Sequence, residues 1–194
     1  MRIILGSASP RRKMLLEQVG LTPEIIPSRA EESPLAVDPE GVVLELSEKK
    51  AEDVAAFCKR DGDDMVVLGA DTLVAVEGKI LGKPESRQEA EEMISLLAGK
   101  VHQVYTGVSL ILIEQGKIAG RQSFAEKTDV SVYPMEPEEI RAYVDSGEPM
   151  DKAGAYGIQG FFAAYIKGIN GDYSNVVGLP LGRTCQALKQ WRKG

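Results

Sequence analysis

Apolar residues in the first part of the chain occur in short runs and at helical spacing, with polar segments between them. Met14, Leu15 and Leu16 form part of the apolar face of a helix that begins at Pro10 and ends before Gly20. The pattern predicts strands at residues 2–5 and 24–27, a helix at 10–19, an acidic, proline-marked loop at 29–41, and a second helix from 42 to about 57.

The apolar run at residues 65–68 is typical of a strand that is buried on both faces. A second strand is expected after it, turning at Glu77-Gly78. Asn170-Gly171 is a strong two-residue turn signal, and it predicts a hairpin between strands at 161–169 and 172–177. The remaining expected elements are helices at 86–98, 137–144 and 180–191 and a long antiparallel pair of strands at 101–113 and 117–132.

Strands and helices therefore alternate irregularly, which indicates an α/β fold with a mixed sheet rather than a regular doubly wound sheet or a barrel. The chain has 194 residues, enough for one sizeable domain or for two small lobes around one cleft. No internal repeat or linker-like stretch divides it, so residues 1–194 are expected to form a single domain.

Composition narrows the class of protein. The apolar share is 43%, the charged share is 27% and the formal net charge is −6, which argues against a nucleic-acid-binding surface but not against a local cationic pocket. No run approaches the ~20 apolar residues of a membrane span, and the N-terminal apolar run is too short for a signal peptide. A cytoplasmic protein with no membrane partner is expected.

The cysteine and histidine content limits the kinds of metal site that the chain could form. Cys58 and Cys185 lie far apart without a CxxC pattern, so both are expected to pack as small apolar residues. His102 is the only histidine, which excludes two-histidine zinc motifs. A metal would have to be a hard ion held by carboxylates and phosphate.

The segment "SASPRRK" (7–13) places three cations at the start of a predicted helix, where the helix dipole disfavours positive charge. Arg11, Arg12 and Lys13 make sense there if a multiply charged anion binds the free N–H groups of the first turn. Ser7 would add a hydroxyl donor. The alternative is that Ser9 caps the helix while the cations face water.

Several other charged residues are candidates for the same chemistry. Asp71 follows an apolar run and is expected at the end of a buried strand, where it could bind Mg²⁺ or accept a proton, or only cap a turn. Lys50 shares the apolar face of its helix, so its ammonium reaches an anion or a carboxylate, or else extends to solvent. Lys83 could reach a phosphate or be solvated. Glu32 could face a metal or belong to a plain acidic loop.

The glycine-rich stretch "MDKAGAYGIQG" (150–160) permits close approach of the backbone to a ligand. The amide of Gln159 could read the edge of a base, although the stretch could equally be a tight connection. No GxxxxGK[ST] segment occurs, so P-loop chemistry is not indicated.

Taken together, these segments resemble the Maf family of nucleotide pyrophosphatases. The resemblance extends over essentially the whole chain. It rests on seven segments in order: "SASPRRK" (7–13), "EKKA" (48–51), "GADTLV" (69–74), "GKP" (82–84), "YTGV" (105–108), "EPMDKAGAYGIQG" (148–160) and "VVGLPL" (176–181).

The resemblance implies hydrolysis of a nucleoside triphosphate to the monophosphate and pyrophosphate with a divalent cation, Mg²⁺ or Mn²⁺. It also implies a homodimer and an elongated mixed sheet in two lobes with a central cleft, similar to inosine-triphosphate pyrophosphatases. The aspartate of the family's "ADT" motif is Asp71, which would accept a proton and, with Glu32, hold the metal. Phosphate contacts would come from Ser7, Arg11, Arg12, Lys13, Lys50 and Lys83.

Three positions indicate the branch that acts on dTTP and UTP. That branch has Arg after Ser-Pro, Thr after the catalytic Asp and Gln in the glycine loop, which correspond to Arg11, Thr72 and Gln159. CTP and modified pyrimidine nucleotides stay open as substrates, as do nucleotide-pool cleaning and control of cell division as roles. The competing interpretation is a non-catalytic nucleotide-binding regulator of septum formation.

Overall fold

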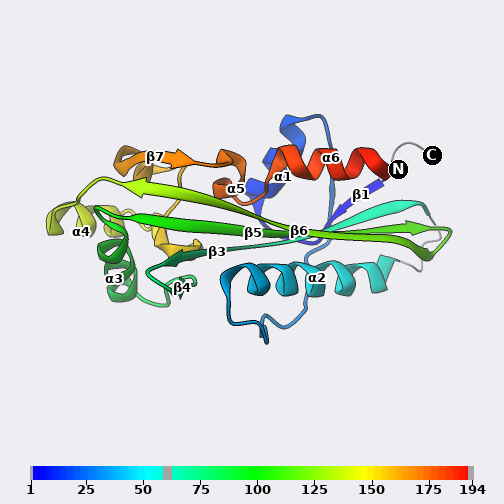
Figure 1. Cartoon of the computed structure of the whole chain (residues 1–194), viewed down its shortest axis with the longest axis horizontal. Coiled ribbons are helices and arrows are strands. Elements are labelled where there is room, and N and C mark those ends of the chain that lie inside the picture. Colours follow the sequence, from blue (N-terminus) through cyan, green and yellow to red (C-terminus); the bar gives the residue numbers. More distant parts are fainter. Residues whose placement is uncertain (1, 59–62, 192–194) are drawn as a thin grey trace. The chain divides into compact units, whose positions relative to one another are not determined.

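The elements of the chain are drawn in Figure 1, from a computed structural model that describes residues 2–58 and 63–191. The strands are β1 (Arg2–Leu5), β2 (Glu24–Ile25), β3 (Met65–Val76), β4 (Lys79–Leu81), β5 (Val101–Glu114), β6 (Lys117–Val132) and β7 (Ile166–Asn170). The α-helices are α1 (Pro10–Gln18), α2 (Pro39–Cys58), α3 (Arg87–Leu97), α4 (Pro137–Asp145), α5 (Tyr173–Val177) and α6 (Leu181–Trp191). Short 3-10 helices are η2 (Glu148–Asp151), η3 (Ala153–Ala155) and η4 (Phe161–Tyr165).

The described strands form one 7-stranded mixed sheet in the order β2-β1-β3-β5-β6-β7, with β4 paired to β3. β1 runs parallel to both β2 and β3, whereas β4 is antiparallel to β3 and β7 is antiparallel to β6. The prediction of an α/β fold with a mixed sheet flanked by helices is therefore confirmed.

By their contacts, the residues form two compact units. Unit 1 comprises residues 1–71, 106–126 and 178–194, and unit 2 comprises residues 72–105 and 127–177. β3, β5 and β6 each contribute residues to both units. Unit 1 contains α1, α2 and α6, and unit 2 contains α3, α4 and α5.

Helix α2 packs directly on the backbone of two strands in unit 1. A Cβ atom added to Gly69 would lie 2.3 Å from the Ser47 carbonyl oxygen, and one added to Gly107 would lie 2.1 Å from that of Val43. Only glycine permits this approach. Apolar residues of α2, β1, β3 and β5 complete the core of unit 1 beside it: Ile4, Ala51, Val54, Ala55, Cys58, Met65, Val67, Ile111 and Ile113.

Helix α6 buries Leu181, Thr184, Ala187 and Leu188, and two further side chains of the helix lie against β6. The guanidinium of Arg183 lies 4.5 Å from the centre of the Phe124 ring, and the Trp191 ring lies against Gly120. Figure 1 shows α2 on one side of the strands of unit 1 and α6 on the other. The sheet of this unit is thus covered on both faces.

Two sequence predictions are wrong. β3 is one continuous strand of 12 residues rather than two, so Asp71 lies within it and not at its end. Burial resumes at Leu73, and the neighbouring β5 is long enough to pair along the whole strand, so the polar residues at 71–72 do not interrupt it. Gly69 serves the approach of α2 and does not break the strand.

The predicted hairpin at Asn170-Gly171 is the second error. The strand before this turn, β7, begins only at Ile166, because residues 161–165 form the 3-10 helix η4 instead of extending the strand, and residues 173–177 form helix α5. Asp172 explains the difference, because its Oδ1 accepts hydrogen bonds from the Ser174 amide at 2.7 Å and the Ser174 hydroxyl at 2.6 Å. These bonds cap a helix start, so the chain leaves the sheet instead of returning along it.

Candidate active site at the start of α1

The turn between β1 and α1 is fixed by backbone and hydroxyl contacts. The Gly6 amide donates to the Leu68 carbonyl at 2.7 Å, which keeps the chain in register with β3 past the end of β1. Ser9 is the N-cap residue of α1 and accepts from the Arg12 amide, while Pro10 occupies the first helical turn. The sequence prediction of this cap is confirmed.

Arg12 is a buried cation, in contrast to the solvated cation of the alternative interpretation. Its Nε donates to the Gly178 carbonyl at 2.8 Å, and its Nη1 donates to the Ser7 hydroxyl at 2.9 Å. Burial lowers the pKa of Arg12, and the charge of Arg11 adds to this effect, whereas the carboxylates of Asp71 and Glu32 oppose it. These four charged groups therefore lie near enough to influence one another.

Two carboxylates meet at one ammonium group beside this arginine. The Nζ of Lys50 donates to Asp71 Oδ1 at 2.6 Å and lies 2.7 Å from Glu32 Oε1. The side chains of Lys50 and Asp71 are only 13% and 14% exposed, while Glu32 is 63% exposed. Lys50 thus reaches a carboxylate, which was one of the two sequence-based alternatives, and does not extend into solvent.

The close packing of α2 places Lys50. The Ser47 carbonyl and the Ala51 amide pack against Gly69. These two backbone groups belong to α2 and lie before and after Lys50 in the sequence. Asp71 lies two positions further along β3, on the same side of the strand as Gly69, because side chains alternate along a strand. The missing side chain of Gly69 therefore lets the ammonium of Lys50 approach Asp71.

The donor set is compatible with a hard divalent cation that is also held by substrate. The oxygens of Asp71 and Glu32 lie within 2.7 Å of a single point, the Nζ of Lys50, and Mg²⁺ takes oxygen ligands of this kind. Among the described residues, no group of three His, Cys, Asp or Glu side chains could hold a metal. Two protein carboxylates need phosphate oxygens to complete such a coordination shell.

The remaining predicted residues are placed as follows. Lys13 is exposed and lies 3.6 Å from Glu17 of its own helix. Thr72 directly follows Asp71 in β3. Lys83 and Gln159 are exposed residues of unit 2. Cys58 is buried, as predicted, but Cys185 is only partly buried.

The backbone of unit 2 brings the segments of Lys83 and Gln159 together. The Gly154 amide of the glycine-rich stretch donates to the Gly82 carbonyl at 2.9 Å. Gly154 has φ +66°, and a Cβ atom there would lie 2.8 Å from the side chain of Val74. The glycine-rich stretch is therefore packed between β3 and the segment that carries Lys83.

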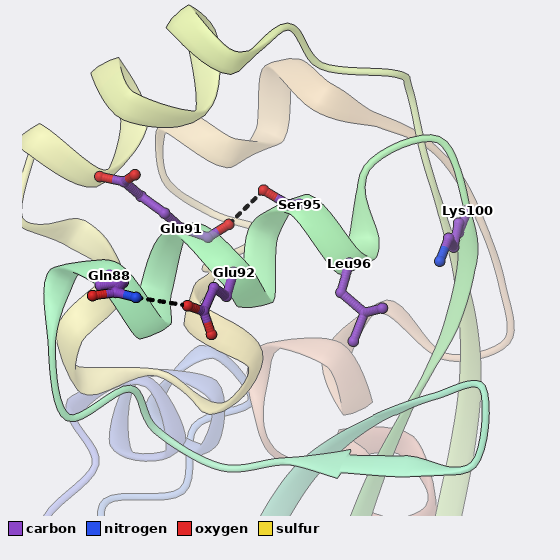
Figure 2. A pocket seen from close by; sticks show the side chains of 6 residues that line it. All are labelled: Gln88, Glu91, Glu92, Ser95, Leu96 and Lys100. Carbon is purple, nitrogen blue, oxygen red and sulfur yellow. Dashed lines mark hydrogen bonds between the residues drawn. The ribbon is translucent and has the colours of Figure 1, made fainter.

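A hollow in the surface of unit 2 contains none of the predicted site residues. Figure 2 shows it beside α3, with a volume of about 520 Å³. It is lined by Gln88, Glu91, Glu92, Ser95, Leu96 and Lys100. Its acidic side chains do not suit a triphosphate.

Sequence reasoning missed the partner that holds Arg12. Gly178 is 166 positions away, and its carbonyl accepts the Nε–H of that arginine. The segment "VVGLPL" contributed to the family resemblance, but nothing local to it indicates an arginine partner. The only signal was the glycine itself, which has φ +129° just before α6.

Within residues 2–58 and 63–191, none of the helices combines the length and the apolar character that a membrane span needs.

Among solved structures, a nucleoside-triphosphatase, or dITP/XTP pyrophosphatase, from Mycobacterium abscessus is 11% identical to this chain, with a TM-score of 0.43. The match covers 97% of this chain and 94% of that chain.

Sequence relatives are much more similar. The dTTP/UTP pyrophosphatase of Agathobacter rectalis is 50% identical, with 97% of both chains covered. That of Carboxydothermus hydrogenoformans is 48% identical, with 98% of this chain and 99% of the relative covered. The family described as Maf-like protein matches residues 2–191. The chain therefore belongs to the Maf-like protein family.

Proposed function

We propose that this protein hydrolyses dTTP and UTP between the α and β phosphates, releasing the nucleoside monophosphate and pyrophosphate. Relatives with about half of their residues identical, over nearly the full length, are named for this activity. The observation that carries the proposal is the buried Arg12 at the start of α1, with the charges of Asp71 and Glu32 acting on it.

Arg12 and the first turn of α1 would bind the phosphates. The free N–H groups of a helix start carry partial positive charge, to which Arg11 and Arg12 add. The bonds to Gly178 and Ser7 fix the guanidinium of Arg12 before substrate arrives, so docking costs little side-chain entropy. Lys83 and Lys13 are proposed as further phosphate contacts.

Asp71 would accept the proton of the attacking water. Lys50 donates to one carboxylate oxygen, Oδ1, which fixes the orientation of the carboxylate. The same ammonium offsets negative charge that moves toward the leaving pyrophosphate. Catalysis of this type consists mainly of positioning and electrostatic stabilisation.

A divalent cation, Mg²⁺ or Mn²⁺, is part of the proposal. Asp71 and Glu32 would hold it together with substrate phosphate oxygens. When bound, it supplies Lewis-acid stabilisation of negative charge on the phosphates.

Arg11, Thr72 and Gln159 would select the pyrimidine. Gln159 is exposed and carries one amide donor group and one acceptor, which match the mixed edge of a thymine or uracil base. Replacement of Gln159 by Glu removes the donor, so the preference for dTTP over GTP is expected to fall.

The test is a product-resolved assay with dTTP and Mg²⁺. Pyrophosphate and dTMP are expected from the wild-type protein, and folded Asp71→Asn protein should release pyrophosphate at least about 100-fold more slowly because the general base is lost. Orthophosphate as the product would indicate another phosphatase. Nucleotide-dependent thermal stabilisation without any product would indicate the non-catalytic regulator instead.

A further inference from the structure

The carboxylate of Glu148 joins two segments of unit 2 that are apart in the sequence. Glu148 is the first residue of η2 and is partly buried. Its Oε2 accepts a hydrogen bond from the Phe161 amide at 2.8 Å, and its Oε1 lies 3.2 Å from the hydroxyl of Tyr143 in α4. The carboxylate therefore connects α4 to the residue two positions after Gln159.

Gly160 lies between Gln159 and Phe161, and its missing side chain leaves room for the Glu148 carboxylate. A Cβ atom on Gly160 would lie 2.2 Å from Glu148 Oε2 and 2.3 Å from Oε1. No side chain larger than hydrogen fits there while Glu148 holds its position. The carboxylate thus contacts the backbone on the C-terminal side of Gln159.

Glu148 and Tyr143 each make a further contact that holds them in place. The Lys152 ammonium donates to the backbone carbonyl of Glu148 at 2.6 Å. Tyr143 is buried, and its hydroxyl also lies 3.3 Å from the Ala155 carbonyl. Burial and the neighbouring charge of Glu148 raise the pKa of Tyr143, so the hydroxyl keeps its proton and stays a donor.

Gln159 itself is exposed, although the residues around it are held. The Gly160 amide donates to the Gly157 carbonyl at 3.2 Å, which closes a short turn around Gln159. A side chain that is exposed on a rigid turn can meet a base edge without first being ordered. The contacts of Glu148 supply this rigidity from outside the turn.

We propose that Glu148, through Tyr143 and the Phe161 amide, is a positioning residue that fixes Gln159 for reading the pyrimidine. This inference rests on the proposed function. Glu148 itself does not touch the substrate, and its effect passes entirely through Gln159.

The first test is a double-mutant cycle on selectivity, the ratio of kcat/KM for dTTP to that for dGTP. Glu148→Ala is expected to lower this ratio about 10-fold in the wild-type background and to leave it unchanged in Gln159→Ala protein. Glu148→Gln, which keeps an acceptor for the Phe161 amide, should stay within about 3-fold of wild type. Tyr143→Phe removes the hydroxyl alone and should lower the ratio in the same direction.

Two results would overturn the proposal: an unchanged ratio in Glu148→Ala, or the same fall of the ratio in the Gln159→Ala background. The matched control is Glu138→Ala, an exposed glutamate of α4 that pairs with nearby Arg141 and should behave as wild type. Comparison of thermal unfolding across the set identifies any variant that fails to fold.

A second arm needs no turnover, so it separates this proposal from the proposed function. Backbone ¹⁵N order parameters at residues 157–161, measured without nucleotide, should fall from about 0.85 to below 0.6 in Glu148→Ala and stay high in Glu148→Gln. A turn that is equally rigid in all three proteins contradicts the proposal, whatever the wild-type enzyme does with dTTP.

Discussion

At the scale of single residues, the contacts of Arg12 explain how one of the three cations at the start of α1 is accommodated. A cation at a helix N-terminus costs about 0.3–1 kcal/mol when exposed, and a buried one would cost more without partners. Here the Gly178 carbonyl, the Ser7 hydroxyl and the charges of Asp71 and Glu32 compensate Arg12. The arginine is therefore held in place before any anion arrives.

Replacement of Arg12 by Ala should lower kcat/KM for dTTP. The expected fall corresponds to about 2–4 kcal/mol of lost transition-state stabilisation, as for the loss of other preorganised donors. Steady-state kinetics of pyrophosphate release measure this. Arg141→Ala, which removes an exposed arginine of α4, is the matched control. A fall in kcat/KM of less than about 3-fold for Arg12→Ala would show that the phosphates bind elsewhere.

His102 predicts a pH dependence of stability. It is fully buried, its Nε2 lies 2.7 Å from the Tyr156 hydroxyl, and its Nδ1 has no partner within the described part of the chain. Burial lowers the pKa of His102 to about 4. The unfolded chain, with a histidine pKa near 6.5, therefore binds a proton that the folded protein rejects as the pH falls from about 6.5 to 4.

Because of His102, the free energy of unfolding should be about 2 kcal/mol lower at pH 5 than at pH 7.5. Above pH 7 both states are neutral at this site, and below pH 4 the loss reaches its limit. Urea unfolding of wild-type and His102→Gln protein at both pH values isolates the contribution, since the carboxylates are common to the two proteins. Equal pH slopes for the two would show that His102 is not buried in neutral form.

At the scale of elements, the approach of α2 to β3 decides whether Lys50 reaches Asp71. A methyl group on Gly69 would lie 2.3 Å from a backbone oxygen, which cannot move like a side-chain tip. The helix would have to shift. The geometry of the Asp71 carboxylate, the proposed general base, therefore depends on a residue that carries no side chain.

Gly69→Ala should destabilise the protein by about 1–3 kcal/mol and lower kcat/KM, because α2 carries Lys50 away from Asp71 as it moves. Chemical denaturation and kinetics of the same protein measure the two effects. Gly182→Ala in α6, where a Cβ atom meets nothing within 4 Å, should be neutral or slightly stabilising. Full stability of Gly69→Ala would contradict the close packing of α2.

Elements with local signals could be predicted from the sequence. Ser9-Pro10 and Ser86 mark helix starts by short-range chemistry, and both caps are present. The errors arose where a distant partner or a competing local bond decides. The long neighbouring strand β5 accompanies a β3 that is continuous past Asp71, and Asp172 caps a helix after a turn signal that favours a hairpin. Local patterns cannot show either outcome reliably.

The candidate site was predictable in part for the same reason. Charges in unusual places mark it in the sequence, such as Lys50 on an apolar helix face and Arg12 at a helix start. The carbonyl partner of Arg12 at Gly178 was not predictable, and neither was the contact between Glu148 and the Phe161 amide, because both depend on backbone atoms that nearly every residue type possesses. A residue type carries no information about such an acceptor or donor.

At the scale of the whole molecule, charge is distributed unevenly. The protein has a net charge of −6 and would repel a triphosphate at long range, yet Arg11, Arg12 and Lys50 gather at one position of unit 1. In the proposed function, a divalent cation would reduce the charge of the nucleotide before it binds. Removal of divalent cations with a chelator should therefore abolish measurable turnover, and added Mg²⁺ should restore it. Turnover that persists in excess chelator would show that the reaction does not need the cation.

The central claim is that water attacks the α-phosphorus of dTTP at the start of α1. Hydrolysis in ¹⁸O-labelled water followed by mass spectrometry of the products tests it most directly, because the water oxygen stays with the phosphorus that it attacks. We predict one ¹⁸O atom in dTMP, none in pyrophosphate, and formation of both products at least about 100-fold more slowly in Asp71→Asn protein. Label in pyrophosphate, or products formed at the wild-type rate by Asp71→Asn, would contradict the account.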